Sequence, residues 1–176
     1  MGAIKRMSLV GMVVLVPMLI YYPIREFGWL LELSFLDPFA WTRDDAWVDP
    51  TAQIAMGTRI AFFVVWMLPI LIGWLAYLAA FSVLTLLWRG IVFDERIARR
   101  LQWMGWGTIA SAVLMLVAGS LSPMIRSWHN ADGPLPLRLW MDVDKLALGF
   151  SGLAFLFFGL VMQHAIRIAR ENEEFV

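Results

Sequence analysis

The hydrophobic positions of this chain gather in four long blocks, and charged intervals separate the blocks. Four runs contain no Asp, Glu, Lys or Arg, and they cover residues 7–24, 60–88, 101–125 and 146–166. A helix needs about 20 apolar residues to cross the hydrocarbon core of a bilayer. The pattern therefore predicts an all-α membrane protein, a four-helix transmembrane bundle formed by one integral membrane domain over residues 1–176.

The charged interval between the second and third runs predicts an amphipathic helix that leads into the third span. Asp94 is expected to cap this helix, because its carboxylate can accept the free amide protons of the first turn. Ile97, Leu101 and Met104 then recur on one helical face and mark its apolar side. The arginines of the interval lie mainly off this face, in the aqueous layer, and they are Arg89, Arg96, Arg99 and Arg100.

These four arginines are the candidate functional residues, and two interpretations stay open. The favoured one is that they only orient the protein, since Lys and Arg beside a span set its topology. The other is that they form a docking surface for lipid headgroups or for a partner protein.

The interval between the first and second runs predicts little regular structure. The apolar positions of residues 27–35 have helical spacing, so this piece is expected to lie as a helix along the bilayer surface. Residues 37–50 contain two Asp-Pro pairs, which mark turns rather than a regular element. The two tryptophans of this piece, Trp41 and Trp47, are expected to be exposed.

The interval between the third and fourth runs contains a different periodicity. Apolar and other residues alternate over residues 135–143, which predicts a half-buried strand with its odd-numbered side chains protected. A single strand leaves its backbone groups without partners. The interval between the first two runs is the expected partner, so a short β element is predicted among these loops.

The fourth run is rich in small residues. Gly149, Gly152 and Gly159 leave its surface without side chains at three positions, and small residues let two membrane helices approach closely. Gly152 is therefore expected to lie at a helix contact.

Composition supports a chain covered by lipid and removes several kinds of chemistry. Hydrophobic residues make up 61% of the 176 positions, which is more apolar surface than a soluble domain of this length can bury. The net charge is zero, which gives no reason to expect direct nucleic-acid binding. There is no Cys, so disulfides, thiolate metal sites and cysteine catalysis are excluded.

The basic residues predict the orientation. They are denser in the termini and the middle interval than in the other two intervals, and the denser side of a membrane protein is cytoplasmic. The sequence therefore predicts a multi-pass protein of the bacterial inner (plasma) membrane with both termini in the cytoplasm. The residues on the denser side are Lys5, Arg6, Arg89, Arg96, Arg99, Arg100, Arg167 and Arg170.

Beyond the four candidate arginines of the middle interval, the sequence offers few residues that could bind a cofactor or a metal or catalyse a reaction. His129 and His164 lie near opposite ends of the membrane-spanning region, about 30 Å apart by helix rise, so a shared haem or metal is very unfavourable. The acidic residues near His129 are a weak candidate for a divalent cation, and solvated loop charge explains them as well. No carboxylate lies within the four runs. No catalytic, cofactor-binding or metal-binding residue is assigned.

Two short pieces carry a family resemblance. In the middle interval, Gly90 is followed by Phe93, the capping residue Asp94, and then Leu101 and Gly105. At the end of the chain, the last helix runs into IRIARENEEFV, an acidic stretch with an Asn and a final hydrophobic residue. With these pieces and its four runs, the chain resembles the bacterial four-span membrane proteins catalogued as domain of unknown function 2975.

The resemblance implies a membrane protein without established activity and supplies no catalytic residues. Members often stand beside small helix-turn-helix regulators, which implies a cytoplasmic regulatory protein as a partner. We therefore expect a non-enzymatic membrane protein that acts by contact through its cytoplasmic face. The alternative is a small transporter or channel, formed by a homo-oligomer.

Overall fold

The computed structural model describes residues 2–37, 39–44 and 47–174, and most of these residues lie in helices. Four helices are long and apolar enough to cross a membrane. No strand occurs among the described residues. The elements are α1 (Ala3–Leu31), the π-helical turn η1 (Glu32–Leu36), α2 (Ala40–Asp44), α3 (Met56–Trp88), α4 (Glu95–Arg126) and α5 (Val143–Glu174).

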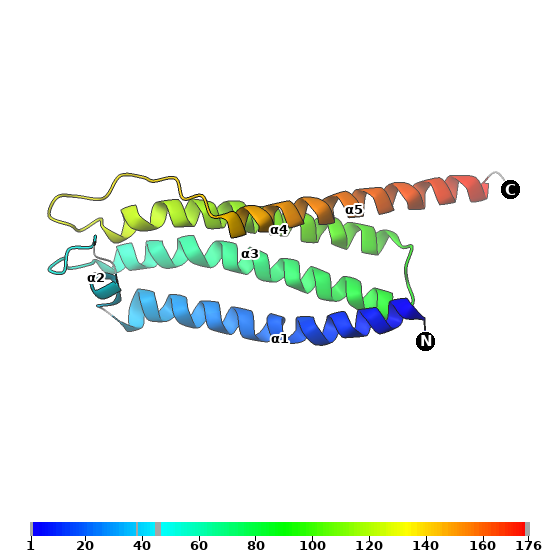
Figure 1. Cartoon of the computed structure of the whole chain (residues 1–176), viewed down its shortest axis with the longest axis horizontal. Coiled ribbons are helices and arrows are strands. Elements are labelled where there is room, and N and C mark those ends of the chain that lie inside the picture. Colours follow the sequence, from blue (N-terminus) through cyan, green and yellow to red (C-terminus); the bar gives the residue numbers. More distant parts are fainter. Residues whose placement is uncertain (1, 38, 45–46, 175–176) are drawn as a thin grey trace.

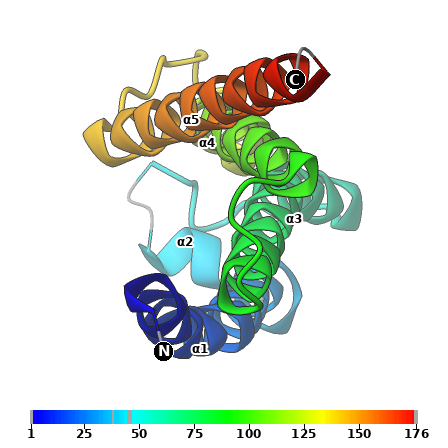
Figure 2. The same ribbon diagram turned by 90° about the vertical axis from the view of Figure 1, so that its right-hand side faces the viewer.

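The four long helices pack in the order in which they occur in the sequence. α1 packs on α3, α3 on α4, and α4 on α5. α1 does not pack along α5, and Figure 2 shows these two helices on opposite sides of the molecule. The bundle is therefore an open array rather than a closed ring. Both termini and the loop between α3 and α4 lie at one end of the molecule, here called the inner end (Figure 1).

The contact between α1 and α3 repairs the hydrogen bonding of α1. Pro23 lies inside α1 and has no N–H, so the carbonyl of Leu19 loses the donor that a helix normally supplies four residues later. The Trp74 indole of α3 donates to this carbonyl at 3.1 Å. A cross-helix hydrogen bond thus satisfies a backbone group that faces the interior of a membrane protein.

α4 and α5 approach most closely, because glycines lie where they cross. A Cβ atom on Gly152 would lie 2.9 Å from the carbonyl oxygen of Gly105, and one on Gly159 would lie 2.9 Å from that of Ala98. The prediction that Gly152 lies at a helix contact is confirmed. Nearer the inner end of the same contact, the Gln102 side-chain amide donates to the Gln163 side-chain oxygen at 2.7 Å.

At the opposite end of the molecule, here called the outer end, the segment between α1 and α3 differs from its predicted form. The piece predicted to lie along the bilayer surface instead continues α1 to Leu31 and then forms η1. The piece predicted as turns contains the short helix α2. Trp41, predicted to be exposed, is completely buried, and Trp47 is partly buried. Their aromatic surface is covered by the ends of the long helices, a tertiary effect that local turn signals do not report.

The predicted strand is also wrong, since residues 135–142 run extended without a strand partner. They lie along the outer part of α4, because α5 is displaced towards the inner end and leaves that surface uncovered (Figure 1). The amide of Leu135 donates to the Ser127 hydroxyl at 2.8 Å, and that of Trp140 donates to the Ser120 hydroxyl at 2.9 Å. Side-chain hydroxyls thus replace a neighbouring strand, and the odd-numbered Leu137 and Leu139 are exposed.

Candidate functional site

The four predicted arginines lie at the inner end, but they have different surroundings. Arg96 forms an ion pair with Asp94 at 2.9 Å. Arg100 is partly buried and donates to the Ser82 carbonyl of α3 at 3.2 Å. Arg89 and Arg99 are exposed to solvent. Arg100 therefore joins α4 to α3, whereas Arg96, although paired with Asp94, is exposed like Arg89 and Arg99.

Asp94 begins α4 as predicted. Its carboxylate accepts the backbone N–H of Arg96 at 2.7 Å and the guanidinium of the same residue at 3.0 and 2.9 Å. The side-chain hydrogen bond from Arg96 is the main cause that lowers the pKa of Asp94 to about 2, and the backbone hydrogen bond adds to it. Asp94 is therefore ionised at neutral pH and fixes the beginning of the helix.

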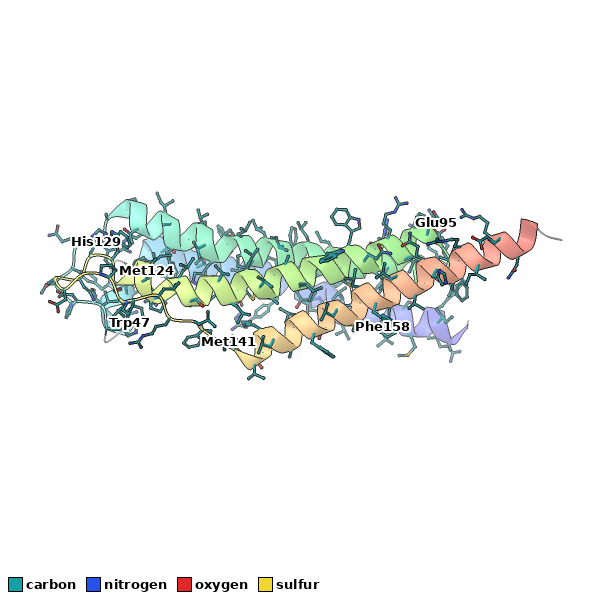
Figure 3. All side chains as sticks on the ribbon, turned by 90° about the horizontal axis from the view of Figure 1, so that it is seen from above. Trp47, Glu95, Met124, His129, Met141 and Phe158 are labelled. Atoms are coloured by element: carbon teal, nitrogen blue, oxygen red, sulfur yellow. The ribbon has the colours of Figure 1, made fainter. Side chains whose placement is uncertain are left out.

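The inner ends of α4 and α5 are joined by a second ion pair. Arg170 of α5 contacts Glu95 of α4 at 2.8 Å, and Glu95 is seen at the inner end in Figure 3. Beyond this pair, α5 projects past the ends of the other helices (Figure 1). Arg167 and Ile168, just before the paired Arg170, and Glu171, just after it, are exposed on α5. The inner end thus combines an exposed charged loop with a free helical extension.

The outer end holds a buried cluster that the sequence did not single out. Trp41 of α2 packs against Phe62 of α3, with ring centroids 5.1 Å apart. The guanidinium carbons of Arg59 and Arg126 each lie 5.5 Å from the centre of the Trp41 ring. Arg126 also lies 5.5 Å from the ring centre of Trp47. Cations over aromatic faces are stabilising, and more so when they are desolvated.

Hydrogen bonds join the same cluster to the rest of the first outer segment. The Trp41 indole donates to the Leu33 carbonyl at 2.9 Å, and Arg59 donates to the Ser34 carbonyl at 3.1 Å. Asn130 bridges the two outer segments: its side-chain amide donates to the Trp47 carbonyl at 2.8 Å, and its side-chain oxygen accepts from the Asp49 amide at 2.9 Å. The outer segments therefore form one packed cap.

The described histidines and acids of this cap do not gather into a metal-binding group. His129 lies at the outer end with Trp47 (Figure 3), and its Nε2 is 2.9 Å from the Thr58 hydroxyl. Asp142 accepts the amide of Asp144 and begins α5 rather than joining His129. Within the described parts of the chain, no three His, Asp or Glu residues lie close enough to hold a metal ion. His164 is exposed on α5.

The outer cluster was missed because its residues were interpreted only by their neighbours in the sequence. Arg59 and Arg126 stand just outside the uncharged runs, where charge is normally solvated. The available signal was that each borders an interval that contains tryptophans, since Arg stacks readily on aromatic faces. The sequence does not say that Trp41 lies between them.

The four long apolar helices, packed in order with charged residues at their ends, define a multi-pass all-α membrane protein. The chain matches the model of a protein family described as protein of unknown function (DUF2975) over residues 39–176. This match covers well over half of the chain, so the protein belongs to that family, as the resemblance implied. No curated protein and no solved structure matches the chain.

Proposed function

We propose that this protein is a non-enzymatic, multi-pass protein of the inner (plasma) membrane that acts by contact through its cytoplasmic face. Both termini are then cytoplasmic, in agreement with the dense basic residues at the inner end. The observation that carries the proposal is the contrast between the two ends. Arg89 and Arg99 are exposed at the inner end, whereas two of the arginines at the outer end, Arg59 and Arg126, are packed on aromatic rings.

The chemistry of the inner end favours a partner with an acidic surface. Exposed arginines attract acidic proteins and anionic lipid, and their guanidinium groups bind carboxylates in a bidentate manner. The last turns of α5 add an exposed Ile168 beside charged residues, which is suited to a protein contact. By family resemblance, a cytoplasmic regulatory protein is the expected partner.

Affinity purification from membranes tests the proposal. The double variant Arg89→Glu/Arg99→Glu reverses the exposed charge and leaves the Asp94 cap and the Arg100 hydrogen bond in place. It should change the set of co-purifying proteins and the phenotype of the cell. Arg138→Glu is the matched control, because Arg138 is exposed at the other end of the molecule. An unchanged set of partners together with an unchanged phenotype would contradict the proposal.

The alternative, a small oligomeric transporter or channel, is tested by ion flux in vesicles that contain the purified protein. One hollow at mid-length has a volume of about 250 Å³ and is lined by all four long helices. Its wall is mainly apolar and contains no charged side chain. This lining favours hydrocarbon over a hydrated ion, so the contact function is the better supported of the two.

A further inference from the structure

A second hollow adjoins the apolar hollow at mid-length, on the side of the helix array where α1 and α5 do not pack on each other. The apolar hollow at mid-length includes Leu15, Ala80 and Phe155 in its wall. The second has a volume of about 300 Å³ and is lined by residues of α1, α3, α4 and α5. Tyr22 and Met115 belong to both walls. The two hollows are therefore neighbouring parts of one groove between α1 and α5.

The two parts of this groove differ in polarity. The second hollow contains two cations, Arg25 of α1 and Lys145 of α5, and one carboxylate, Glu26. Arg25 lies 3.9 Å from Glu26, too far for a close hydrogen-bonded pair, and the Arg25 side chain is 66% exposed. Lys145 lies 3.9 Å from Asp142. These charges are consequently available to a ligand that carries both signs.

The charged part lies where the uncharged runs of α1 and α5 end. Arg25 follows the first uncharged run and Lys145 precedes the fourth, so both mark the boundary where the apolar part of a helix ends. Trp29 and Trp66 are in the same wall, and tryptophan is enriched at this boundary. The groove is thus apolar in the first hollow and charged in the second, which matches the change of polarity along a phospholipid.

Trp66 supplies a further polar group on this wall. Its indole N–H is buried and has no hydrogen-bond acceptor among the described residues. A buried donor without an acceptor is costly. A ligand that brings an acceptor oxygen to this wall would satisfy it.

We propose that the groove between α1 and α5 binds one phosphatidylethanolamine molecule from the outer leaflet. The phosphate lies between Arg25 and Lys145, the primary ammonium donates to Glu26, and one acyl chain enters the apolar hollow. Charge complementarity selects this headgroup, because a lipid with a phosphate alone leaves Glu26 facing like charge. A quaternary ammonium lacks the N–H groups that Glu26 accepts, so phosphatidylcholine binds less well.

Native mass spectrometry of the delipidated full chain tests this proposal directly. Phosphatidylethanolamine should bind as one retained molecule, and more tightly than phosphatidylglycerol or phosphatidylcholine. Lys145→Gln should weaken its binding about tenfold, since one cation beside a phosphate at a membrane surface accounts for about this factor. Arg138→Gln is the matched control, because Arg138 is exposed in the preceding segment and does not line the groove.

A second pair of variants tests the acyl-chain part. Ser151 lines the apolar hollow, and its hydroxyl donates only to its own helix, to the Ala147 carbonyl at 2.9 Å. Ser151→Phe should fill the hollow and abolish retention of the lipid. Leu153→Phe is the control, since Leu153 is exposed on α5 and outside the hollow. Gel filtration and circular dichroism confirm that each variant is folded.

Three results would overturn the proposal. The first is equal binding of the three lipids, which indicates a headgroup that is not recognised. The second is binding that neither Lys145→Gln nor Ser151→Phe changes, which indicates ordinary surrounding lipid. The third is a cross-link between α1 of one molecule and α5 of another in a bilayer, which indicates that a second copy occupies the groove.

Discussion

Gly152 of α5 lies directly against Ile109 of α4, so that a Cβ atom on Gly152 would be 2.8 Å from the Ile109 Cγ1 atom. Substitution by leucine must separate the two backbones, and overpacking of this kind costs about 2 kcal/mol or more. We expect Gly152→Leu to lower the thermal unfolding temperature in detergent. Gly28→Leu is the control, because a Cβ at Gly28 meets no atom within 4 Å. Equal stability of both variants would contradict close packing at Gly152.

Leu101→Asp should damage insertion or folding far more than Arg100→Gln. Leu101 packs with Ile97 in the small apolar core at the inner end. An acidic residue costs about 3 kcal/mol at the centre of a membrane helix and less near its end. Arg100→Gln loses one hydrogen bond to Ser82, worth about 1 kcal/mol. The yield of folded protein in membranes compares them, and a larger loss for Arg100→Gln would make that arginine a specific functional group.

Trp74 and Pro23 should be energetically coupled. Trp74→Phe removes the donor to the Leu19 carbonyl, and an unsatisfied acceptor in this environment costs about 1–2 kcal/mol. Pro23→Ala restores the backbone N–H that normally bonds to that carbonyl. We therefore expect the Trp74→Phe change to destabilise the wild-type protein more than the Pro23→Ala variant. A double-mutant cycle in detergent measures this difference, and additive effects would show that the hydrogen bond contributes nothing.

Topology should follow the positive-inside rule. A reporter fused after Val176 and a reporter inserted near Asp94 should both read cytoplasmic, and one near Asp132 should read external. The reporter near Asp132 also tests whether the groove between α1 and α5 opens to the outer leaflet, because the charged part of this groove is on the Asp132 side. A cytoplasmic reading near Asp132 would exclude the proposed orientation.

The cap of α4 should weaken in acid. The pKa of Asp94 in the folded protein is about 2, below its ordinary value of 3.8. A depressed pKa means that the stabilisation is complete above the ordinary pKa and is lost as the pH falls through the folded pKa. Between about pH 4 and pH 2, the protection of the Arg96 amide, which is the intrinsic exchange rate divided by the observed rate at the same pH, should decrease. Asp94→Asn keeps a capping oxygen without titrating, so the protection in this variant should not change over this pH range.

The sequence predicted the long helices well because the bilayer imposes a length on uncharged runs. It predicted their ends poorly, since charged residues continue a helix beyond the membrane; α5 extends past the run that ends at residue 166. Gly152 could be predicted as a contact because glycine is the residue that lets two backbones meet. The helix that Gly152 contacts, α4, could not be predicted, because periodicity indicates which face of a helix is buried and not which helix packs on that face.

The structure of the two outer segments, in contrast, was predicted poorly. The alternation over residues 135–143 is real, but α4 offers hydroxyl groups at Ser120 and Ser127 where a strand would need a neighbouring backbone. Trp41 is buried because two arginines from different helices stack on it. Such contacts join residues far apart in the chain, and no local pattern encodes them. The four candidate arginines lie at the same end as the termini, and the structure separates Arg96 and Arg100, which have hydrogen-bond partners, from the exposed Arg89 and Arg99.

The packing of each long helix on its predecessor has a consequence for biosynthesis. Every major interface joins two helices that leave the ribosome one after the other. Such contacts have a low sequence separation, which favours rapid folding. The nascent chain can therefore assemble hairpin by hairpin during translation, and no span has to wait in the bilayer for a distant partner that has not yet been made.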